Sequence, residues 1–208
     1  MQAVILAAGE SSRFWPLNKK HKSLFKIMGK PLMCYKIENL EKAGIREIII
    51  VQKSKKDIEN ELKCYQLPKN LKIKYVLQEK PLGTGDALKV AGIYLKERFL
   101  VLNGDDFYEA EDIKKCLSKF PAILVKEMAN PKNFGVIVPA KNYVKEIVEK
   151  SEKPPANLVN IGCYFIDCNN SCSSVRRQTS ISGYGLVLVS RDTPAGYRSR
   201  PDRYTGYG

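Results

Sequence analysis

The alternation of strand and helix patterns constrains the fold of this chain more than any other feature of its sequence. Short apolar and β-branched runs, typical of buried strands, occur at 4–7, 47–52, 72–78 and 99–102. Helical patterns follow them, beginning at Pro31, Ser54, Thr84 and Glu111. Strands that alternate with helices favour a mostly parallel sheet with helices on both faces. The sequence therefore predicts a three-layer α/β fold, with ligands at the carboxyl ends of the strands.

Several segments carry more specific signals. Pro31 suits the first turn of a helix that ends near Gly44. Its expected apolar residues are Leu32, Tyr35, Ile37 and Leu40. Ser54 is expected to cap the next helix, and further helices are predicted at 84–96 and 111–119. Successive strands are then predicted at 122–127, 135–139, 144–149 and 159–167.

The charge of the chain favours an anionic partner. Lys and Arg number 35 against 22 Asp and Glu, which gives a net charge of +13 over 208 residues. Phosphorylated metabolites, nucleic acid or a membrane surface would suit this surplus, and a lysine-rich proteome would explain it equally well. No aromatic and basic stripe or helix-turn-helix pattern supports a nucleic-acid partner. No apolar run is long enough for a membrane span, so no membrane partner is expected.

The cysteines favour a reducing compartment. None of the six forms a C-x-x-C pair, and the single His21 is not close to any of them, so neither a zinc site nor a redox pair is predicted. Cys34, Cys64 and Cys116 fall in helical patterns and are expected to be buried. Because the first residues also lack the features of a signal peptide, we expect a cytoplasmic protein.

The last part of the chain has a different composition. Residues 1–153 contain all 26 lysines and three arginines, whereas 154–208 contain no lysine and six arginines. We therefore predict a core at 1–167 and an atypical Arg/Ser/Gly-rich tail at 168–208, in which only 185–189 resembles a strand. A flexible natural tail is one interpretation. A shifted reading frame or cloning scar is the other, and resequencing the coding DNA distinguishes them.

The loop after the first strand has the composition of a phosphate site. Residues 6–13 read LAAGESSR, so small residues let backbone N–H groups approach a ligand. Arg13 adds a fork of donors suited to phosphate, and Lys22 follows on the same loop. The loop matches neither a Walker motif nor G-x-G-x-x-G. Gly9 as a plain turn residue and Arg13 as a surface charge remain equally good interpretations.

Acidic residues end the strand at 99–102. Asn103-Gly-Asp105-Asp106 would face the same crevice as the first loop. Mg²⁺ takes one or two carboxylates together with phosphate oxygens, so Asp105 is a candidate ligand. Asp106 is the better candidate for a turn residue, and turn formation alone would also explain both acids.

Two further motifs are weaker. Gln78, Pro81 and Gly83 follow a strand, where an amide can contact the edge of a base; a turn with Thr84 as helix N-cap explains them equally well. Glu149-Lys150 and Asn160-Ile-Gly162 flank a proline-containing loop. A Glu can accept from sugar hydroxyls and a Lys can hold phosphate, although such a pair is more often a surface ion pair.

The order of these motifs resembles that of the sugar-1-phosphate nucleotidylyltransferases, above all the archaeal-type glucose-1-phosphate thymidylyl- or uridylyltransferases and N-acetylglucosamine-1-phosphate uridylyltransferases. The family opening L-A-A-G-x-G-T-R-x-x-P-L reads LAAGESSRFWPL at 6–17, followed by GKP at 29–31. The base motif Q-x-x-P-x-G-T begins at Gln78, and the metal motif is Asn103-Gly-Asp105. The sugar-side motifs appear at 134–136, 149–150 and 160–162. The resemblance covers about residues 1–167.

This resemblance implies a Rossmann-like fold of the nucleotide-diphospho-sugar transferase type and a role for each matching residue. Transfer of a nucleotidyl group from UTP or dTTP to a sugar 1-phosphate would release pyrophosphate. Arg13 and Lys22 would be catalytic, and Asp105 would bind Mg²⁺. The residues that would bind nucleotide are Leu6, Ala8, Gly9, Ser11, Gln78, Pro81, Gly83 and Thr84. The residues that would hold the sugar phosphate are Gly135, Glu149, Lys150 and Asn160.

The sequence departs from the family at three places. Ser11-Ser12 replaces the usual G-T, and Lys22-Ser23 replaces K-P. The family carries a second Mg²⁺-ligand Asp on a later strand, but this chain leaves the pattern after Asp167. The alternative functions are a nucleotide-binding module with weak or no turnover and a related transferase for another acceptor, such as a molybdopterin guanylyltransferase. A homo-oligomer is compatible with the sequence.

Overall fold

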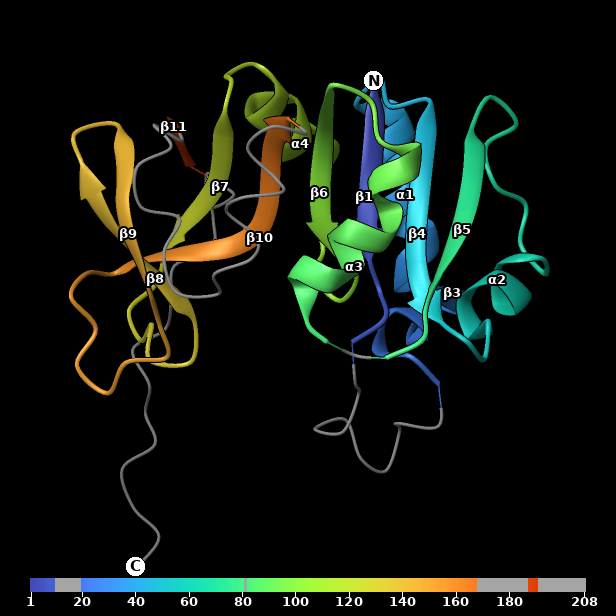
Figure 1. Cartoon of the computed structure of the whole chain (residues 1–208), viewed down its shortest axis with the longest axis horizontal. Coiled ribbons are helices and arrows are strands. Elements are labelled where there is room, and N and C mark those ends of the chain that lie inside the picture. The colour runs from blue at the N-terminus through green and yellow to red at the C-terminus, as the bar shows by residue number, and fades with distance from the viewer. Residues whose placement is uncertain (10–19, 81, 168–186, 191–208) are drawn as a thin grey trace, which may run out of the picture.

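A parallel sheet forms the first half of the molecule, as the alternation predicts. The structure is a computed structural model that describes residues 1–9, 20–80, 82–167 and 187–190. Four strands are parallel in the order β5-β4-β1-β6. Their bounds are β1 Gln2–Leu6, β4 Glu47–Lys53, β5 Lys72–Gln78 and β6 Arg98–Asn103. Their carboxyl ends therefore share one edge, at the bottom of Figure 1.

Helices cover both faces of this parallel sheet, because its strands are apolar on both sides. Ala3 and Ile5 of β1 belong to one core cluster, which also contains buried residues of α1 (Leu32–Lys42), α2 (Asp57–Leu62) and α4 (Ala110–Leu117). Val4 belongs to a second cluster, which α3 (Thr84–Ala91) covers. In Figure 1, α3 lies in front of the sheet and α1 behind it. The predicted three-layer α/β fold is confirmed.

The second half of the sheet is mostly antiparallel. β10 (Leu158–Asp167) runs antiparallel to β6 on one side and to β7 (Ala122–Glu127) on the other. β8 (Gly135–Ala140) and β9 (Tyr143–Glu149) form a hairpin, and β10 also contacts β8 through Val159 and Val136. β11 (Val187–Ser190) pairs parallel to β7, so part of the predicted tail contributes a strand. The full order is β5-β4-β1-β6-β10-β7-β11-β9-β8.

Short elements connect the helices and strands. These are η2 (Lys22–Leu24), β2 (Lys26–Ile27), β3 (Lys30–Pro31) and η3 (Gly92–Tyr94). None of the helices in the described ranges is long and apolar enough to cross a membrane.

Four local predictions are wrong. Ser54 does not cap α2, since the N-cap is Lys56 in a left-handed conformation. The helix predicted at 84–96 ends at Ala91 and continues as η3, because Gly92 ends the regular helix. Cys64 lies beyond the end of α2 and is exposed, whereas Cys34 and Cys116 are buried as predicted. The buried face of α1 comprises Met33, Cys34, Lys36, Ile37 and Leu40, so it is rotated from the predicted set.

Candidate functional site

The loops after β1 and β6 meet at the carboxyl edge of the parallel sheet. The Gly104 N–H donates to the Leu6 carbonyl at 2.8 Å. A Cβ on Gly104 would lie 2.8 Å from both the Leu6 oxygen and the Ala7 Cβ, which is closer than real Cβ contacts. The glycine of the predicted metal motif is therefore needed for space. It allows the two predicted phosphate and metal loops to touch.

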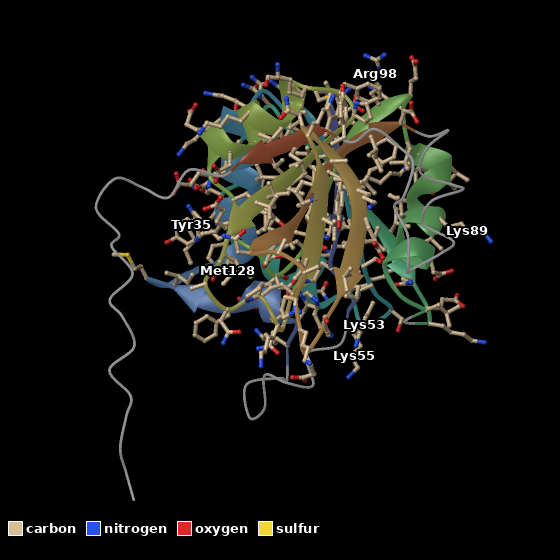
Figure 2. All side chains as sticks on the ribbon, turned by 90° about the vertical axis from the view of Figure 1, so that its left-hand side faces the viewer. Tyr35, Lys53, Lys55, Lys89, Arg98 and Met128 are labelled. Atoms are coloured by element: carbon tan, nitrogen blue, oxygen red, sulfur yellow. The ribbon has the colours of Figure 1, made fainter. Side chains whose placement is uncertain are left out.

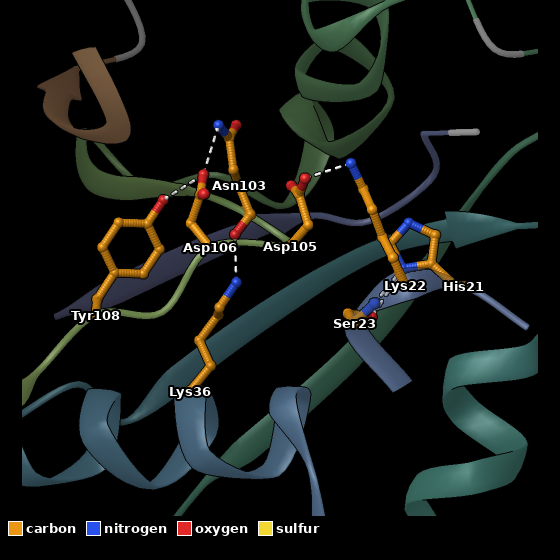
Figure 3. Close-up of polar contacts among 8 residues, drawn as sticks. All are labelled: His21, Lys22, Ser23, Lys36, Asn103, Asp105, Asp106 and Tyr108. Atoms are coloured by element: carbon orange, nitrogen blue, oxygen red, sulfur yellow. Dashed lines mark hydrogen bonds and ion pairs between the residues drawn. The ribbon is translucent and has the colours of Figure 1, made fainter. Parts of the chain in front are cut away.

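Lys22 and Asp105 form an ion pair across this junction (Figure 3). Both side chains are about one third exposed. Burial opposes ionisation of Asp105, but the hydrogen bond and charge of Lys22 outweigh it, so the pKa of Asp105 is lowered. The structure thus brings together one predicted catalytic residue and the predicted metal ligand, and it keeps that carboxylate ionised.

His21 positions the segment that carries Lys22. Its Nδ1 accepts from the Ser23 backbone N–H at 3.2 Å and lies 2.8 Å from the Ser23 hydroxyl, so the ring caps η2. Burial, together with the charge of Lys22, lowers the pKa of His21 to about 4. The ring is therefore neutral at physiological pH. His21 is a capping residue, which agrees with its interpretation from sequence as a loop residue.

A buried lysine lies beneath the loop after β6. Lys36 of α1 is fully buried and donates to the Asn103 carbonyl (Figure 3). Its Nζ lies 5.3 Å from the centre of the Tyr108 ring. Burial lowers the pKa of Lys36 to about 7, although Asp106 and Asp105 act to raise it. Sequence reasoning missed Lys36; the available signal was a lysine among the apolar positions of a helix.

Asp106 and Tyr108 connect the same loop to β10. Asp106 accepts from the Asn103 side-chain amide at 3.2 Å and lies 3.4 Å from the Tyr108 hydroxyl. That hydroxyl also lies 2.8 Å from the Ile161 carbonyl oxygen. Gly162 has φ +70°, and a Cβ there would overlap the Asn103 side-chain amide. Asp106 is thus a structural residue of the turn, consistent with its predicted role, and Asn103 packs directly on the Asn160-Ile-Gly162 motif.

The predicted sugar-phosphate residues lie side by side on three strands. Gly135 and Glu149 are register partners in the hairpin of β8 and β9. A Cβ on Gly135 would lie 2.8 Å from Glu149 Oε1, so the glycine leaves room for this carboxylate. The pairing of Val159 with Val136 places Asn160 next to Gly135. Lys150 follows Glu149 with φ +45° and donates its N–H to the Phe134 carbonyl at 3.2 Å.

The side chain of Asn160 is already engaged within β10. Its Oδ1 accepts from the Gly162 N–H at 2.9 Å, and its Nδ2 donates to the Tyr164 hydroxyl at 2.5 Å. These bonds shape the irregularity of β10 between Asn160 and Tyr164, where its register with β7 shifts. Asn160 therefore organises the turn of the motif in addition to any contact with a ligand.

Gln78 ends β5 and faces the start of α3. Its Nε2 donates to Asp86 Oδ2 at 2.8 Å and lies 3.3 Å from the Gly83 carbonyl oxygen. Gly83, at φ +96°, is the N-cap of α3 and no side chain caps this helix, so the alternative of Thr84 as N-cap is wrong. Two donor contacts on Nε2 orient the amide and leave Oε1 as an acceptor.

Basic residues stand around the carboxyl edge. Lys53 ends β4, and Figure 2 shows it with Lys55 near the carboxyl edge, whereas Arg98, at the start of β6, lies at the opposite edge. Lys53 also contributes to the lowered pKa of His21, after burial and Lys22, which places its charge near that ring. The positive charge of this edge suits a polyphosphate.

The remaining predicted nucleotide residues are only partly described. Leu6 and Ala8 lie on β1 and its loop, and Gly9 is exposed with open space around its Cα. Ser11, Arg13 and Pro81 lie outside the described residues. Within the described ranges, no three His, Cys, Asp or Glu side chains gather as a metal cluster. One carboxylate, Asp105, nevertheless suits Mg²⁺, which completes its shell with phosphate oxygens and water.

Known proteins resemble this chain in sequence and in fold. A family model described as nucleotidyl transferase matches residues 2–176. The bifunctional protein GlmU of Methanocaldococcus jannaschii is 38% identical over 169 residues, which cover 80% of this chain and 40% of that protein. A bifunctional sugar-1-phosphate nucleotidylyltransferase/acetyltransferase of Sulfurisphaera tokodaii is 34% identical over 219 residues and covers 100% of this chain and 51% of that protein. The chain thus spans about two fifths to one half of these curated relatives.

A solved structure shares the fold. A Bacillus anthracis protein, provisionally named a glucose-1-phosphate thymidylyltransferase and crystallised with sucrose, superposes with a TM-score of 0.78. The match covers 92% of this chain and 87% of that chain at 19% identity. This likeness supports the architecture, including the antiparallel half that carries Gly135, Glu149 and Asn160.

Proposed function

Because the chain belongs to the nucleotidyl transferase family, we propose that it transfers a nucleotidyl group from UTP or dTTP to a sugar 1-phosphate and releases pyrophosphate. The single observation that carries this proposal is the junction at Gly104, which holds Lys22 and Asp105 together at the carboxyl edge. A cation and a carboxylate at that edge suit a nucleoside triphosphate and its metal ion.

The orientation of Gln78 favours a base with an imide N–H. Since Nε2 donates to Asp86, Oε1 is the atom that can accept from a ligand. Uracil and thymine present an N3–H donor, whereas adenine and cytosine present an acceptor at the equivalent position. Guanine also carries a ring N–H, so GTP is the most informative competitor. Gly83 has a positive φ, which favours glycine, and because it has no Cβ a planar ring can approach its backbone.

The sugar phosphate would bind on the antiparallel half. Glu149 is exposed at the end of β9 and can accept from sugar hydroxyls, while Lys150 carries a positive charge suited to phosphate. Gly135 and Asn160 would complete this subsite from the neighbouring strands β8 and β10. Transfer requires both substrates at once, and β10, which pairs with β6 as well as β8, joins the two halves.

The proposed reaction needs no general base. The sugar phosphate is already ionised and attacks the α-phosphorus in line, so the P–O bond to pyrophosphate breaks as the new bond forms. The protein must position two anions and offset their repulsion. Lys22 and Arg13 would stabilise the charge that develops on the departing pyrophosphate, as donors worth about 3–4 kcal/mol each in comparable sites.

Asp105 would hold the Mg²⁺ that this chemistry implies. Its carboxylate is ionised, partly exposed and adjacent to the predicted phosphate loop. Bound there, Mg²⁺ would supply positive charge against the phosphate oxygens. Asp106 is turned toward Asn103 and Tyr108, which leaves Asp105 as the better ligand of the two.

Pyrophosphate release tests the proposal. Glucose 1-phosphate and N-acetylglucosamine 1-phosphate would each be combined with UTP, dTTP, GTP and ATP in the presence of Mg²⁺. Turnover with one sugar and UTP or dTTP is the expected result. A clear preference for GTP would favour the related guanylyltransferase instead.

Nucleotide binding without turnover would favour the non-catalytic binding module. We propose that the core ends at the predicted boundary 167/168. In that outcome, the frame-shift or cloning-scar interpretation of 168–208 would be tested next. Resequencing the coding DNA would then be the next step. An alternative frame that encodes lysine-rich α/β sequence would support that interpretation, and its absence would contradict it.

A further inference from the structure

Lys36 occupies a position where a charge needs an explanation. It lies on the buried face of α1 between Met33 and Leu40, and none of its surface is exposed. Moving an ammonium from water into such a site costs several kcal/mol unless its partners compensate. Methionine would fill the same space without this cost. The contacts of the ammonium should therefore reveal its role.

Its two direct contacts lie at the end of β6 and in the loop that follows it. Lys36 donates to the Asn103 carbonyl and lies over the Tyr108 ring. The charged and titratable groups that face it are Asp106, Asp105, Cys163 and Lys22. Lys22, which is about one third exposed, pairs with Asp105, whereas the fully buried Lys36 lies beneath the loop (Figure 3). Two lysines thus contact this segment at different points, Lys22 at Asp105 and Lys36 at Asn103.

Tyr108 extends this arrangement to the sugar half. Its ring contacts Lys36, and its hydroxyl lies 2.8 Å from the Ile161 carbonyl oxygen and 3.0 Å from that of Gly162. Ile161 and Gly162 belong to β10, next to Asn160. A shift of the loop at Asn103 would therefore also displace Gly162, because a Cβ on Gly162 would already overlap the Asn103 side chain.

We propose that Lys36 is a positioning residue that fixes the Asn103–Asp106 loop from beneath and, through Tyr108, sets its position relative to the Asn160–Gly162 segment. When it is protonated, below about pH 7, the ammonium also offsets the two adjacent carboxylates Asp105 and Asp106, which act to keep its proton. The contribution of Lys36 to catalysis rests on the proposed function, whereas its role in ordering the loop does not.

The test compares K36M with two partner variants. K42M makes the same chemical change at an exposed position in the last turn of α1 and serves as the matched control. D106N keeps an acceptor for Asn103 and Tyr108 but removes one negative charge. Hydrogen exchange of the backbone amides at 103–108 and 160–163 is measured for K36M, K42M, D106N and the double variant K36M/D106N.

K36M is expected to raise exchange in both segments about tenfold or more, because a hydrogen bond to a charged group is lost. K42M should match the unsubstituted protein. Adding D106N to K36M should lower the exchange rates part of the way back, because less negative charge is then left without a partner. Unchanged exchange in K36M, or simple addition of the two effects in the double variant, would overturn the proposal.

Y108F provides a milder second variant if K36M does not fold. It keeps the ring over Lys36 and removes only the hydroxyl, so faster exchange should be confined to 106 and 160–163. An unchanged pattern there would contradict the connection to β10.

Kinetics then separate this role from general stability. Since Asp105 is displaced, the Mg²⁺ concentration for half-maximal rate should rise about tenfold in K36M, equivalent to about 1.4 kcal/mol, with a smaller change in KM for the triphosphate. An unchanged Mg²⁺ requirement would remove the catalytic part of the proposal. If the unsubstituted protein shows no turnover at all, the proposed function fails while the exchange measurements still decide the role of Lys36.

Discussion

Replacing Gly104 by alanine should damage both the fold and the site, because the added methyl group has nowhere to go. Gly104 does not have a left-handed conformation, so backbone strain is not the reason. The new Cβ would instead lie 2.8 Å from the Leu6 oxygen and from the Ala7 Cβ. Neither of these is the end of a flexible side chain. The two loops would have to separate, and the Gly104 to Leu6 hydrogen bond would lengthen or break.

The magnitude follows from these two losses. Overpacking of one methyl group in a close-packed interior costs about 1–3 kcal/mol. A weakened hydrogen bond adds about 1 kcal/mol. The free energy of unfolding should therefore fall by about 2–4 kcal/mol, and at about 2–4 °C per kcal/mol for a chain of this size the melting temperature should fall by about 4–16 °C.

Activity should fall further than stability alone requires. Separation of the loops moves Asp105 away from Lys22, and a misplacement of about 1 Å in such a site can lower a rate about 10²-fold. Thermal unfolding by calorimetry and pyrophosphate release at a temperature where both proteins are folded measure the two effects separately. G92A is the matched control, since nothing lies within 4 Å of its Cβ and its conformation is helical.

G92A should be neutral or slightly stabilising. The reasoning would be refuted by a G104A protein that melts within 2 °C of the unsubstituted one and turns over at the same rate. Loss of activity with unchanged melting would show that the loops separate without strain. That result would contradict the packing argument but agree with the proposed role of the loops in the site.

Three further predictions test other parts of the site. K22M and R13A should each lower kcat at least about 10²-fold with little effect on folding, and a normal rate in either variant would remove that residue from its role. The pKa of His21 is about 4 in the folded protein, against 6.5 for the free side chain. Between pH 6.5 and 4 the unfolded chain therefore binds a proton at His21 that the folded protein does not. The free energy of unfolding should consequently fall by up to about 3 kcal/mol as the pH drops over this range. H21N keeps an acceptor for Ser23 and should flatten this part of the stability profile; an unchanged profile would assign the loss to other groups. G162A should cost about 2–5 kcal/mol from its positive φ and its overlap with Asn103, and it should raise KM for the sugar 1-phosphate; melting like that of the unsubstituted protein would contradict both.

The order of elements was predictable because it depends on local patterns. The β-branched run at 48–51 is typical of a buried strand, and the structure places it in β4 with alternate residues in the two core clusters. Gly44 marked the end of α1 to within two residues, since the helix ends at Lys42. The strand at 187–190 also fits its apolar run, because β7 offers a free neighbour position and backbone pairing depends little on the composition around it.

The errors came from structural alternatives and contacts between distant segments, neither of which a linear sequence pattern reveals. Ser54 is a good cap by type, but Lys56 in a left-handed conformation starts α2 two residues later. Pairings between distant segments were equally hidden. The contact of Gly104 with Ala7 and that of Gly162 with Asn103 depend on which strands are neighbours, so the sequence could show a glycine at each place but not its reason.

The buried charge of Lys36 marks the limit of pattern reasoning most clearly. Binary patterning treats a lysine on a helix as exposed. It therefore assigned Leu32 and Tyr35 to the buried face of α1, beside the correctly assigned Ile37 and Leu40. The true face includes Lys36 because the loop after β6 supplies a carbonyl, an aromatic ring and two carboxylates around its ammonium. Those partners come from a segment nearly seventy residues away. Only the parallel pairing of β1 with β6 brings that loop over α1.

β10 joins the two halves of the proposed site. It pairs with β6 of the parallel half and with β7 and β8 of the antiparallel half, so one strand carries both the contact with Asn103 and the position beside Gly135. β10 would therefore fix the position of a nucleotide bound at Asp105 relative to that of a sugar phosphate bound near Glu149. Because transfer needs the two phosphates in line, a change within Asn160–Gly162 should alter the rate with both substrates saturating. A change at Lys150, which follows β9 and is exposed, should alter only the affinity for the sugar phosphate.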